Sequence, residues 1–398
     1  MLIELLLSLF MGIIFGIITG LAPGIHTNLV SAILLSLSAS LVLFFSPLTL
    51  VIFIVTMSIT NSFLDFIPSI YLGAPDEDTA LSVLPGHFLL LKGKGHEAIL
   101  LSLLGALCGI ALLVIIIPLF ILIIPKIYPF IERMMSYFLV LICILLLSRA
   151  KEKIPALVIF ILAGFLGFLT LSLPLKQPLL CLLTGLFGSS TLIYSISQKT
   201  EIPEQKISPL KLDKKIFIKP LLASSIVSPI VSFFPGMGNS EAAISGSTLL
   251  GKLSRKQFLI LLGSISTLTM ALSFVALYSI NKARTGSAAA VSQLINLDFS
   301  SLLLILISIT LVSLISSLIA IKLSKIFAKN ISKFNYSKIS LAVLIFLSLI
   351  VLFFSGFMGF LVFISSTILG LTCSYFSVRK GYLMASLLVP TIFLYLPI

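Results

Sequence analysis

Two short stretches of the sequence place Pro-Gly inside an apolar run and follow it with small polar residues. The first is Thr19–Asn28 (TGLAPGIHTN), and the second is Val231–Ser240 (VSFFPGMGNS). Proline lacks a backbone N–H and glycine adopts dihedral angles that other residues avoid, so a helix is expected to stop at each Pro-Gly and to restart at the polar residues. A pair of breaks in corresponding places is typical of the substrate site of a secondary transporter. The alternative is a pair of ordinary turns between helices.

The candidate substrate-binding residues at these breaks are the Pro-Gly pairs and the polar residues that follow them. They are Pro23, Gly24, His26, Thr27, Asn28, Pro235, Gly236, Asn239 and Ser240. A helix that restarts after a break presents its N-terminus, which carries roughly half a positive charge and attracts anions. Two roles stay open for His26, since a histidine can bind substrate or simply cap a turn.

A second pair of polar interruptions lies further along the chain. One covers residues 61–79 and is followed by Leu84–His87, and the other is Asn281–Ser287 (NKARTGS). We expect both to form further re-entrant segments with their tips near the middle of the membrane.

Charged residues at membrane depth are costly and mark function by default. Lys282 and Arg284 lie beside Thr285 at the end of an apolar run, where either cation can pair with a substrate carboxylate or act as an interfacial anchor. Four acidic residues are candidates for coupling transport to Na⁺ or H⁺, because carboxylate oxygens suit both ions. They are Asp65, Asp76, Asp78 and Glu241. The acidic cluster at 76–78 can equally be a solvated turn.

The composition places these residues in a cell membrane. Hydrophobic residues make up 59% of the chain and charged residues only 10%, and runs such as Ala98–Ile124 exceed the ~20 residues that cross a bilayer. The predicted fold class is therefore an all-α polytopic membrane protein. The net charge of +13 fits basic anchors in short loops and not nucleic-acid binding. The four cysteines and three histidines have no spacing typical of disulfides or zinc, no cofactor is expected, and no cleavable signal peptide is evident.

A polar stretch at residues 199–218 divides the chain into two halves, residues 1–198 and 219–398. Apolar segments begin at 48, 98, 134, 155 and 177 in the first half, and at 257, 300, 339, 357 and 381 in the second. This regular offset predicts an internal repeat with about ten spanning helices plus four re-entrant segments. In a rival count some hairpins are full spans, which gives about 12 or more crossings.

Loop charges predict that the second half is inverted relative to the first. The loop at residues 149–153 (RAKEK) is basic, whereas its counterpart near Gly356 is uncharged. A cytoplasmic linker puts both termini outside and leaves few basic residues there, as the positive-inside rule requires. Those few are Lys126, Arg133, Lys176, Lys282 and Arg284.

Several motifs resemble the large membrane subunit of tripartite tricarboxylate transporters, the TctA family. They are Gly16–Gly24 (GIITGLAPG), Gly73–Thr79 (GAPDEDT), Leu84–Gly86 (LPG), Lys92–Ala98 (KGKGHEA) and Phe233–Gly238 (FFPGMG). The resemblance implies a secondary carrier for citrate-like carboxylates that is driven by an ion gradient. It also implies two partners, a small membrane subunit and an extracytoplasmic solute-binding protein. Substrate-loop positions of the family fall on Gly73, Pro75 and Thr79, besides the two Pro-Gly pairs.

The chain departs from the family pattern at two places. His26-Thr-Asn28 replaces a glycine-rich continuation, and the loop at 76–78 is more acidic than a tricarboxylate site favours. The expected function is a secondary-active permease that moves a small organic anion, a di- or tricarboxylate, by alternating access. Membrane lipids are expected to surround it. The alternative is a flippase for a polyprenyl or other lipid phosphate, since basic residues and Pro-Gly hairpins suit that function too. An enzyme is not expected, because no acid–base pair or Walker A loop stands out.

Overall fold

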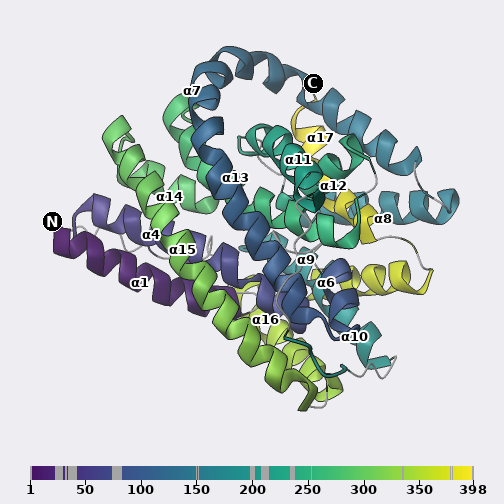
Figure 1. The fold of residues 1–398 in the computed structure, drawn as a ribbon. Helices are drawn as coiled ribbons and strands as arrows, with labels where there is room; N and C mark the ends of the chain where they lie inside the picture. The colour runs from purple at the N-terminus through teal and green to yellow at the C-terminus, as the bar shows by residue number, and fades with distance from the viewer. Residues whose placement is uncertain are drawn as a thin grey trace.

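The described residues of the computed structural model form helices and no strands (Figure 1). The structure describes residues 2–22, 30–31, 34, 43–73, 83–148, 150, 152–197, 202–207, 215–233, 238–251, 253–333, 336–376, 378 and 380–396. Within this part of the chain, 7 helices are long and apolar enough to cross a membrane. The protein is therefore an all-α polytopic membrane protein, as its composition predicts.

The helices of the first half have the following bounds. They are α1 (Leu2–Leu21), α4 (Pro47–Leu64), α5 (Phe66–Tyr71), α6 (Val83–Leu90), α7 (Gly95–Ser148), α8 (Lys153–Ser172), α9 (Pro178–Leu183), the π-helix η1 (Thr184–Ser189) and α10 (Ser190–Ser197). The second half contains α11 (Lys215–Val231), α12 (Asn239–Leu249), α13 (Arg255–Ile280), α14 (Gly286–Leu294), α15 (Phe299–Asn330), η2 (Ile331–Lys333), α16 (Tyr336–Tyr375), η3 (Lys380–Met384) and α17 (Ala385–Leu394).

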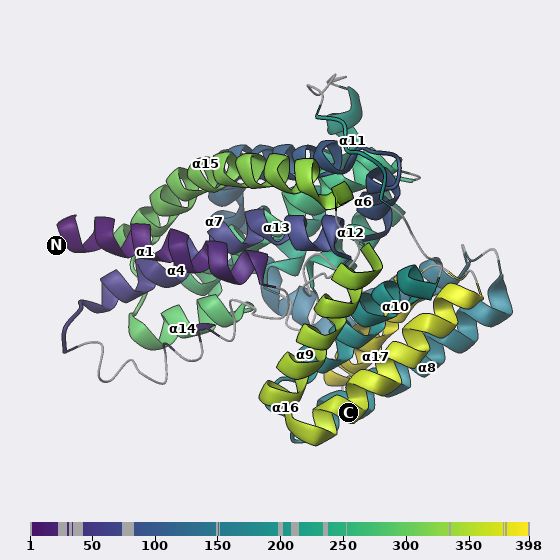
Figure 2. The same ribbon diagram turned by 90° about the horizontal axis from the view of Figure 1, so that it is seen from below.

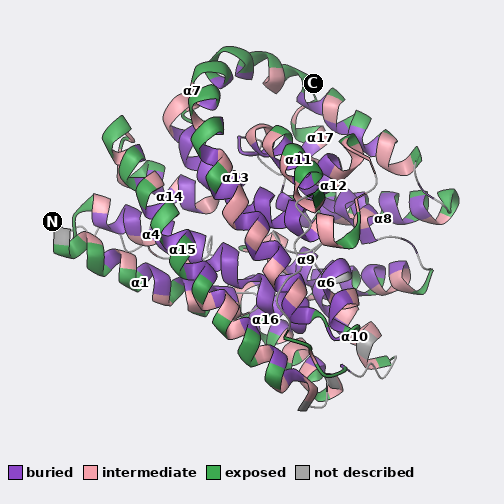
Figure 3. Cartoon of the chain, in the orientation of Figure 1, coloured by how far each residue is buried: buried purple, intermediate pink, exposed green. Residues whose placement is uncertain are grey.

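Two helices form the centre of the molecule, one from each half. The most apolar windows of the α4–α5 segment and of α13 are 94% buried, whereas those of the other five long helices are 22–44% buried. Figure 3 shows the buried residues concentrated in the middle of the fold and the exposed ones on the outer helices. The outer helices therefore present apolar faces to lipid, and α4 and α13 are surrounded by protein.

The contacts between helices occur in corresponding pairs. Helix α1 packs on α4 as α11 packs on α13, and α4 contacts α15 of the other half as α13 contacts α7. Helix α8 packs on α17, and the α9–η1–α10 segment packs on α16. Figure 2 shows the last group, α8, α9, α10, α16 and α17, as a separate bundle beside the rest, and we name it, with η1 and η3, the outer bundle. Each half is thus completed by helices of the other.

Close helix crossings depend on glycine. A Cβ on Gly105 of α7 would lie 2.2 Å from the carbonyl oxygen of Ile260 in α13, and one on Gly263 would lie 2.0 Å from that of Ser102. Thr267 of α13 donates a hydrogen bond of 2.9 Å to the Ala106 carbonyl at the same crossing. Small residues let membrane helices approach closely enough for such contacts.

Two long helices each cover a pair of predicted apolar segments, and only one of them is broken at the predicted boundary. Helix α7 runs through both apolar segments of the 95–148 region without a break, and its interior contains Pro118, Pro125 and Pro129. At 1.5 Å per residue its length is about 80 Å, far more than one bilayer, and Figure 1 shows that it bends. Helix α16, in contrast, is broken at Gly356, whose φ of 67° and ψ of −170° are not helical. That break lies at the predicted segment boundary.

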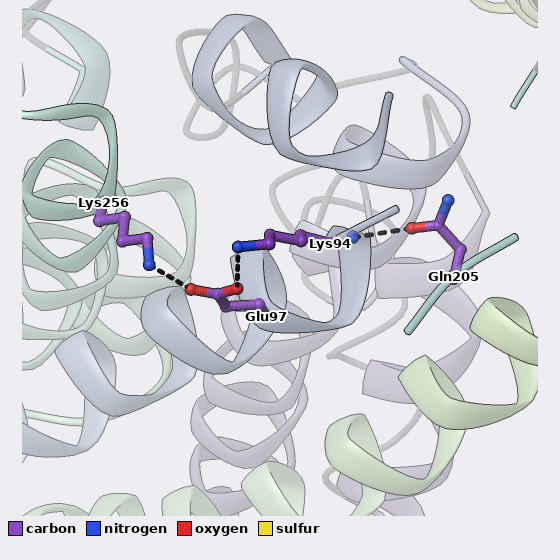
Figure 4. Close-up of polar contacts among 5 residues, drawn as sticks. Lys94, Glu97, Gln205 and Lys256 are labelled. Atoms are coloured by element: carbon purple, nitrogen blue, oxygen red, sulfur yellow. Dashed lines mark hydrogen bonds and ion pairs between the residues drawn. The ribbon is translucent and has the colours of Figure 1, made fainter. Parts of the chain in front are cut away.

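The described part of the linker is bound to the first half. The side chain of Gln205 donates to the Leu90 carbonyl and accepts from the Gly95 backbone N–H, at 3.0 and 2.8 Å. Beside this contact, Glu97 lies between the ammonium groups of Lys94 and Lys256, as Figure 4 shows. The pair with Lys256 joins the start of α7 to the start of α13, so these two helix ends lie on the same side of the molecule.

Candidate functional site

The second polar interruption of the second half forms the start of a short, half-buried helix. Helix α13 ends at Asn281, which has a left-handed φ of 53°, a conformation that asparagine tolerates at a helix end. The chain then reaches Thr285, whose hydroxyl caps α14 by accepting from the Ala288 backbone N–H at 3.1 Å. The same hydroxyl lies 3.2 Å from the hydroxyl of Ser273 on α13. The predicted residue Thr285 is therefore part of a polar contact between α13 and α14.

A cluster of three buried serine hydroxyls joins the two halves at this point. The Ser287 hydroxyl of α14 lies 2.6 Å from that of Ser58 on α4 and 3.4 Å from that of Ser31. Ser58 donates its own proton to the Ile54 carbonyl, so Ser287 is the donor to Ser58 and keeps its oxygen free to accept. Ser31 follows the first Pro-Gly break in sequence. The cluster thus brings Ser31, which follows the first Pro-Gly break, against Ser287, which ends the interruption Asn281–Ser287.

Polar side chains continue along one face of α13. Ser266, Thr269 and Ser273 are spaced three and four residues apart, which places them on the same side of the helix. The hydroxyls of Ser266 and Thr269 are fully buried and have no hydrogen-bond partner within the described structure. Buried polar groups are normally satisfied, so these two hydroxyls are available for water or a ligand.

The restart after the second Pro-Gly break is the N-terminus of α12. Asn239 and Ser240 are its first residues, and their side chains are 3% and 0% exposed. The side-chain oxygen of Asn239 has no partner in the described structure. Helix α12 packs on α11, α13 and α7, so its N-terminus is enclosed by helices of both halves. A buried helix N-terminus is suited to an anion, whereas the unpartnered amide oxygen of Asn239 is an acceptor and is suited to a hydrogen-bond donor or a cation.

Asp65 and Gly73 mark the breaks around α5. Asp65 lies between α4 and α5 and is 3% exposed. One turn before it, the Asn61 amide donates to the Thr19 hydroxyl of α1 at 3.2 Å. Gly73 follows α5 with a φ of +66°, a left-handed conformation that favours glycine. Asp65 is thus a carboxyl group held in the core at the end of a central helix.

The two predicted cations differ in their surroundings. Lys282 is 51% exposed, forms an ion pair of 3.5 Å with Glu132 of α7, and lies 5.7 Å from the centre of the Tyr128 ring. Arg284 is half-buried. The structure therefore gives Lys282 an acidic partner on the surface, and it places Arg284 closer to the capped start of α14.

Many of the predicted site residues lie outside the described part of the chain. They are Pro23, Gly24, His26, Thr27, Asn28, Pro75, Asp76, Asp78, Thr79, Pro235 and Gly236, and for Glu241 only the backbone is described. Among the described residues, no group of three or more His, Cys, Asp or Glu side chains could hold a metal ion. Ser31, Ser58 and Ser287 were not among the predicted site residues, because serine is common throughout the apolar segments and only Ser287 lies in a predicted interruption.

Comparison with known proteins identifies the family. The model of the family described as "Tripartite tricarboxylate transporter TctA family" matches residues 6–385, which is nearly the whole chain. The chain belongs to the TctA family. A curated relative is the "Uncharacterized protein MJ1079" of Methanocaldococcus jannaschii, which is 32% identical over 405 residues, covering 98% of this chain and 99% of the relative. No solved structure matches the chain.

Membership of the TctA family confirms the resemblance seen in the motifs and gives the protein a transport function. A TctA protein is a component of a tripartite transporter, so a small membrane subunit and a solute-binding protein are associated with the family. The apolar helices and the family together place this TctA protein in a membrane as a multi-pass protein. The family is one of transporters, which points away from an enzyme.

Proposed function

We propose that this TctA protein is a secondary-active carrier for a small organic anion, a di- or tricarboxylate, that works by alternating access. The observation that carries the proposal is the contact of Ser31, Ser58 and Ser287 in the buried core, because it joins interrupted segments of both halves. A site between two halves can open to either side when the halves move relative to each other.

The anion is selected in this arrangement by helix N-termini and by the unpartnered hydroxyls of Ser266 and Thr269. The N-terminus of α12 is buried and that of α14 is half-buried, and both belong to helices that restart after a break. Asn239 at the first and Thr285 with Ser287 at the second supply short polar side chains near those ends. Arg284, directly before the cap of α14, is the basic residue best placed to meet a carboxylate.

Coupling to Na⁺ or H⁺ is part of the proposal, and Asp65 is its described candidate. The residue is a carboxyl group buried at the end of α4, the central helix that also contributes Ser58. Charged groups in such positions in membrane proteins form ion and proton pathways. Asp76, Asp78 and Glu241 stay predictions from the sequence.

The test is uptake of radiolabelled succinate and citrate into proteoliposomes that contain the purified protein. Asn239→Ala and Ser287→Ala each remove a buried polar group from the proposed site, and we expect uptake to fall at least tenfold in both. Ser292→Ala is the matched control, because Ser292 lies on the same helix α14 but is exposed. Uptake by both site variants at the wild-type rate would contradict the site, and vesicles that move lipid phosphate but no carboxylate would favour a flippase.

A further inference from the structure

Lys380 is a buried cation that the sequence does not distinguish from a loop anchor. It is the first residue of η3, at the start of the last apolar segment, and it is 6% exposed. Its ammonium group donates to the hydroxyls of Ser190 and Thr191 on α10, at 3.0 and 2.6 Å. Lys380 therefore connects the two end segments of the outer bundle, one from each half.

The two hydroxyls hold the ammonium group but do not neutralise it. Each donates its own proton to a carbonyl four residues earlier, Ser190 to Leu186 and Thr191 to Phe187, so each can only accept from the lysine. Those carbonyls belong to η1, a π-helix, and such segments are frequent at functional sites. The lone pairs that face Lys380 are thus fixed by the local helix geometry.

No carboxylate forms an ion pair with Lys380 within the described structure. The ammonium group has three donors, and the two hydroxyls take two of them. Burying a charge without a counter-charge is costly, and no described residue supplies that counter-charge; the acidic residues at 76–78 lie outside the described part of the chain.

The lysine also lies beside the first half's second interruption. Leu72, within that interruption, packs in one cluster with Leu192 of α10 and Leu347 of α16, and Leu192 lies two residues after Ser190. The described part of the interruption therefore approaches the part of the outer bundle where the ammonium group is held.

We propose that Lys380, held by Ser190 and Thr191, is a substrate-binding residue whose ammonium group pairs with a carboxylate of the transported anion beside the first half's second interruption. The proposal rests on the carrier function above. It adds that the ammonium group of Lys380 is a fixed positive charge in the substrate site. The carboxylate supplies the missing counter-charge, so the site is completed only when the solute is bound.

Thermal unfolding of the purified protein in detergent, with and without citrate or succinate, tests the proposal. Lys380→Met has nearly the same shape but no charge. We expect it to unfold at the same or a higher temperature than the wild type without an anion, since an unpaired buried charge is removed. We also expect the anion to stabilise the wild type, and its apparent affinity to fall at least tenfold in Lys380→Met.

Two variants serve as controls. Lys380→Arg keeps the charge and should retain part of the response to citrate or succinate. Lys176→Met removes the exposed lysine at the start of the corresponding segment of the first half, and its response should equal that of the wild type.

Three results would overturn the inference, and they are distinguishable. If wild type and Lys380→Met respond equally to the anions, Lys380 is not a binding residue, while the carrier function stands. If Lys380→Met is less stable than the wild type both with and without anion, the lysine is a structural hydrogen-bond donor only. If the wild type neither responds to citrate, succinate or inorganic phosphate nor takes up any of them, the carrier function fails and the inference fails with it.

Discussion

Ser287 lies within hydrogen-bonding distance of two other serines, and two further hydroxyls on α13 are buried without a partner in the described structure. The core of this membrane protein thus contains small polar groups where a soluble protein of similar hydropathy would contain methyl groups. Hydroxyls of this kind cost little to bury compared with charges, and they can exchange one partner for another. That property suits a site that is alternately filled and emptied.

The ion pair between Lys282 and Glu132 gives a prediction at this scale. Both side chains are substantially exposed, so their attraction is screened by water and salt. We expect Lys282→Ala to change the free energy of unfolding by under about 1 kcal/mol, and uptake to stay near the wild-type rate. Denaturant titration and uptake in proteoliposomes measure the two quantities.

Glu132→Ala is the matched variant for Lys282→Ala. A loss of uptake in Lys282→Ala but not in Glu132→Ala would instead make Lys282 a substrate-binding residue, the functional role that the sequence left open.

Residue-level chemistry is the part that the sequence predicted least. The buried position of Lys380 depends on which helix face packs on α10, and that is decided by tertiary contacts that hydropathy does not contain. The same holds for Ser58, which is one of several hydroxyl residues on α4 and is distinguished only by its partner Ser287. In contrast, the cap at Thr285 and the start of α12 at Asn239 follow from local chemistry, and both appear where the sequence places polar residues after a break.

Helices in this fold approach each other where glycine or another small residue permits it. The crossing of α7 and α13 has glycine on both sides, at Gly105 and Gly263. These contacts place backbone against backbone, so they allow no side chain to rearrange and accommodate an added methyl group.

Gly105→Ala is the corresponding test. A Cβ there would lie 2.2 Å from the Ile260 carbonyl oxygen, which is backbone and cannot rotate away. We expect a loss of about 1–3 kcal/mol in stability, measured by unfolding in a denaturing detergent. For Gly246→Ala on α12, the nearest atom would be 3.4 Å away, so stability should be unchanged or rise by up to about 1 kcal/mol. Equal stability of both variants would show that the α7–α13 crossing is looser than described.

Element boundaries were largely predictable, and the exceptions have physical reasons. Long apolar runs specify spanning helices because a bilayer admits few alternatives. The predicted loop near Lys126 is wrong, because α7 continues through that region. Proline can bend a membrane helix without ending it, and α7 contains three prolines in its interior. The break at Gly356 was predictable, since a glycine at an uncharged boundary can adopt the positive φ that is found there.

The whole molecule is organised by contacts that occur in corresponding pairs between the halves. Helix α4 meets α15 as α13 meets α7, and α8 meets α17 as α16 meets the α9–η1–α10 segment. This correspondence is what a repeated unit produces when its two copies are related by an approximate two-fold axis. The repeat and the opposite orientation of its copies stay predictions, the first from the spacing of the apolar segments and the second from the loop charges.

Labelling with a membrane-impermeant maleimide tests that orientation. Single cysteines at Lys153 and Phe357, both exposed, mark corresponding loops of the two halves on a background in which the four native cysteines are replaced by serine or alanine. We expect the cysteine at position 357 to react from the outside of intact cells and the one at position 153 to react only after permeabilisation. Reaction of both from the same side would mean that the halves are parallel, and alternating access by inverted repeats would then be excluded.

The exchange of helices between the halves also constrains how the protein is made. When the first half leaves the ribosome, α4, α7 and α8 are already in the membrane, but α15, α13 and α17 have yet to be synthesised. Until the chain is nearly complete, the glycine and hydroxyl faces of the early helices therefore lack their packing partners and contact lipid or the insertion machinery. If synthesis stopped after the first half, the helix faces that normally pack against the second half would stay exposed. Membrane proteases would be expected to recognise such a fragment.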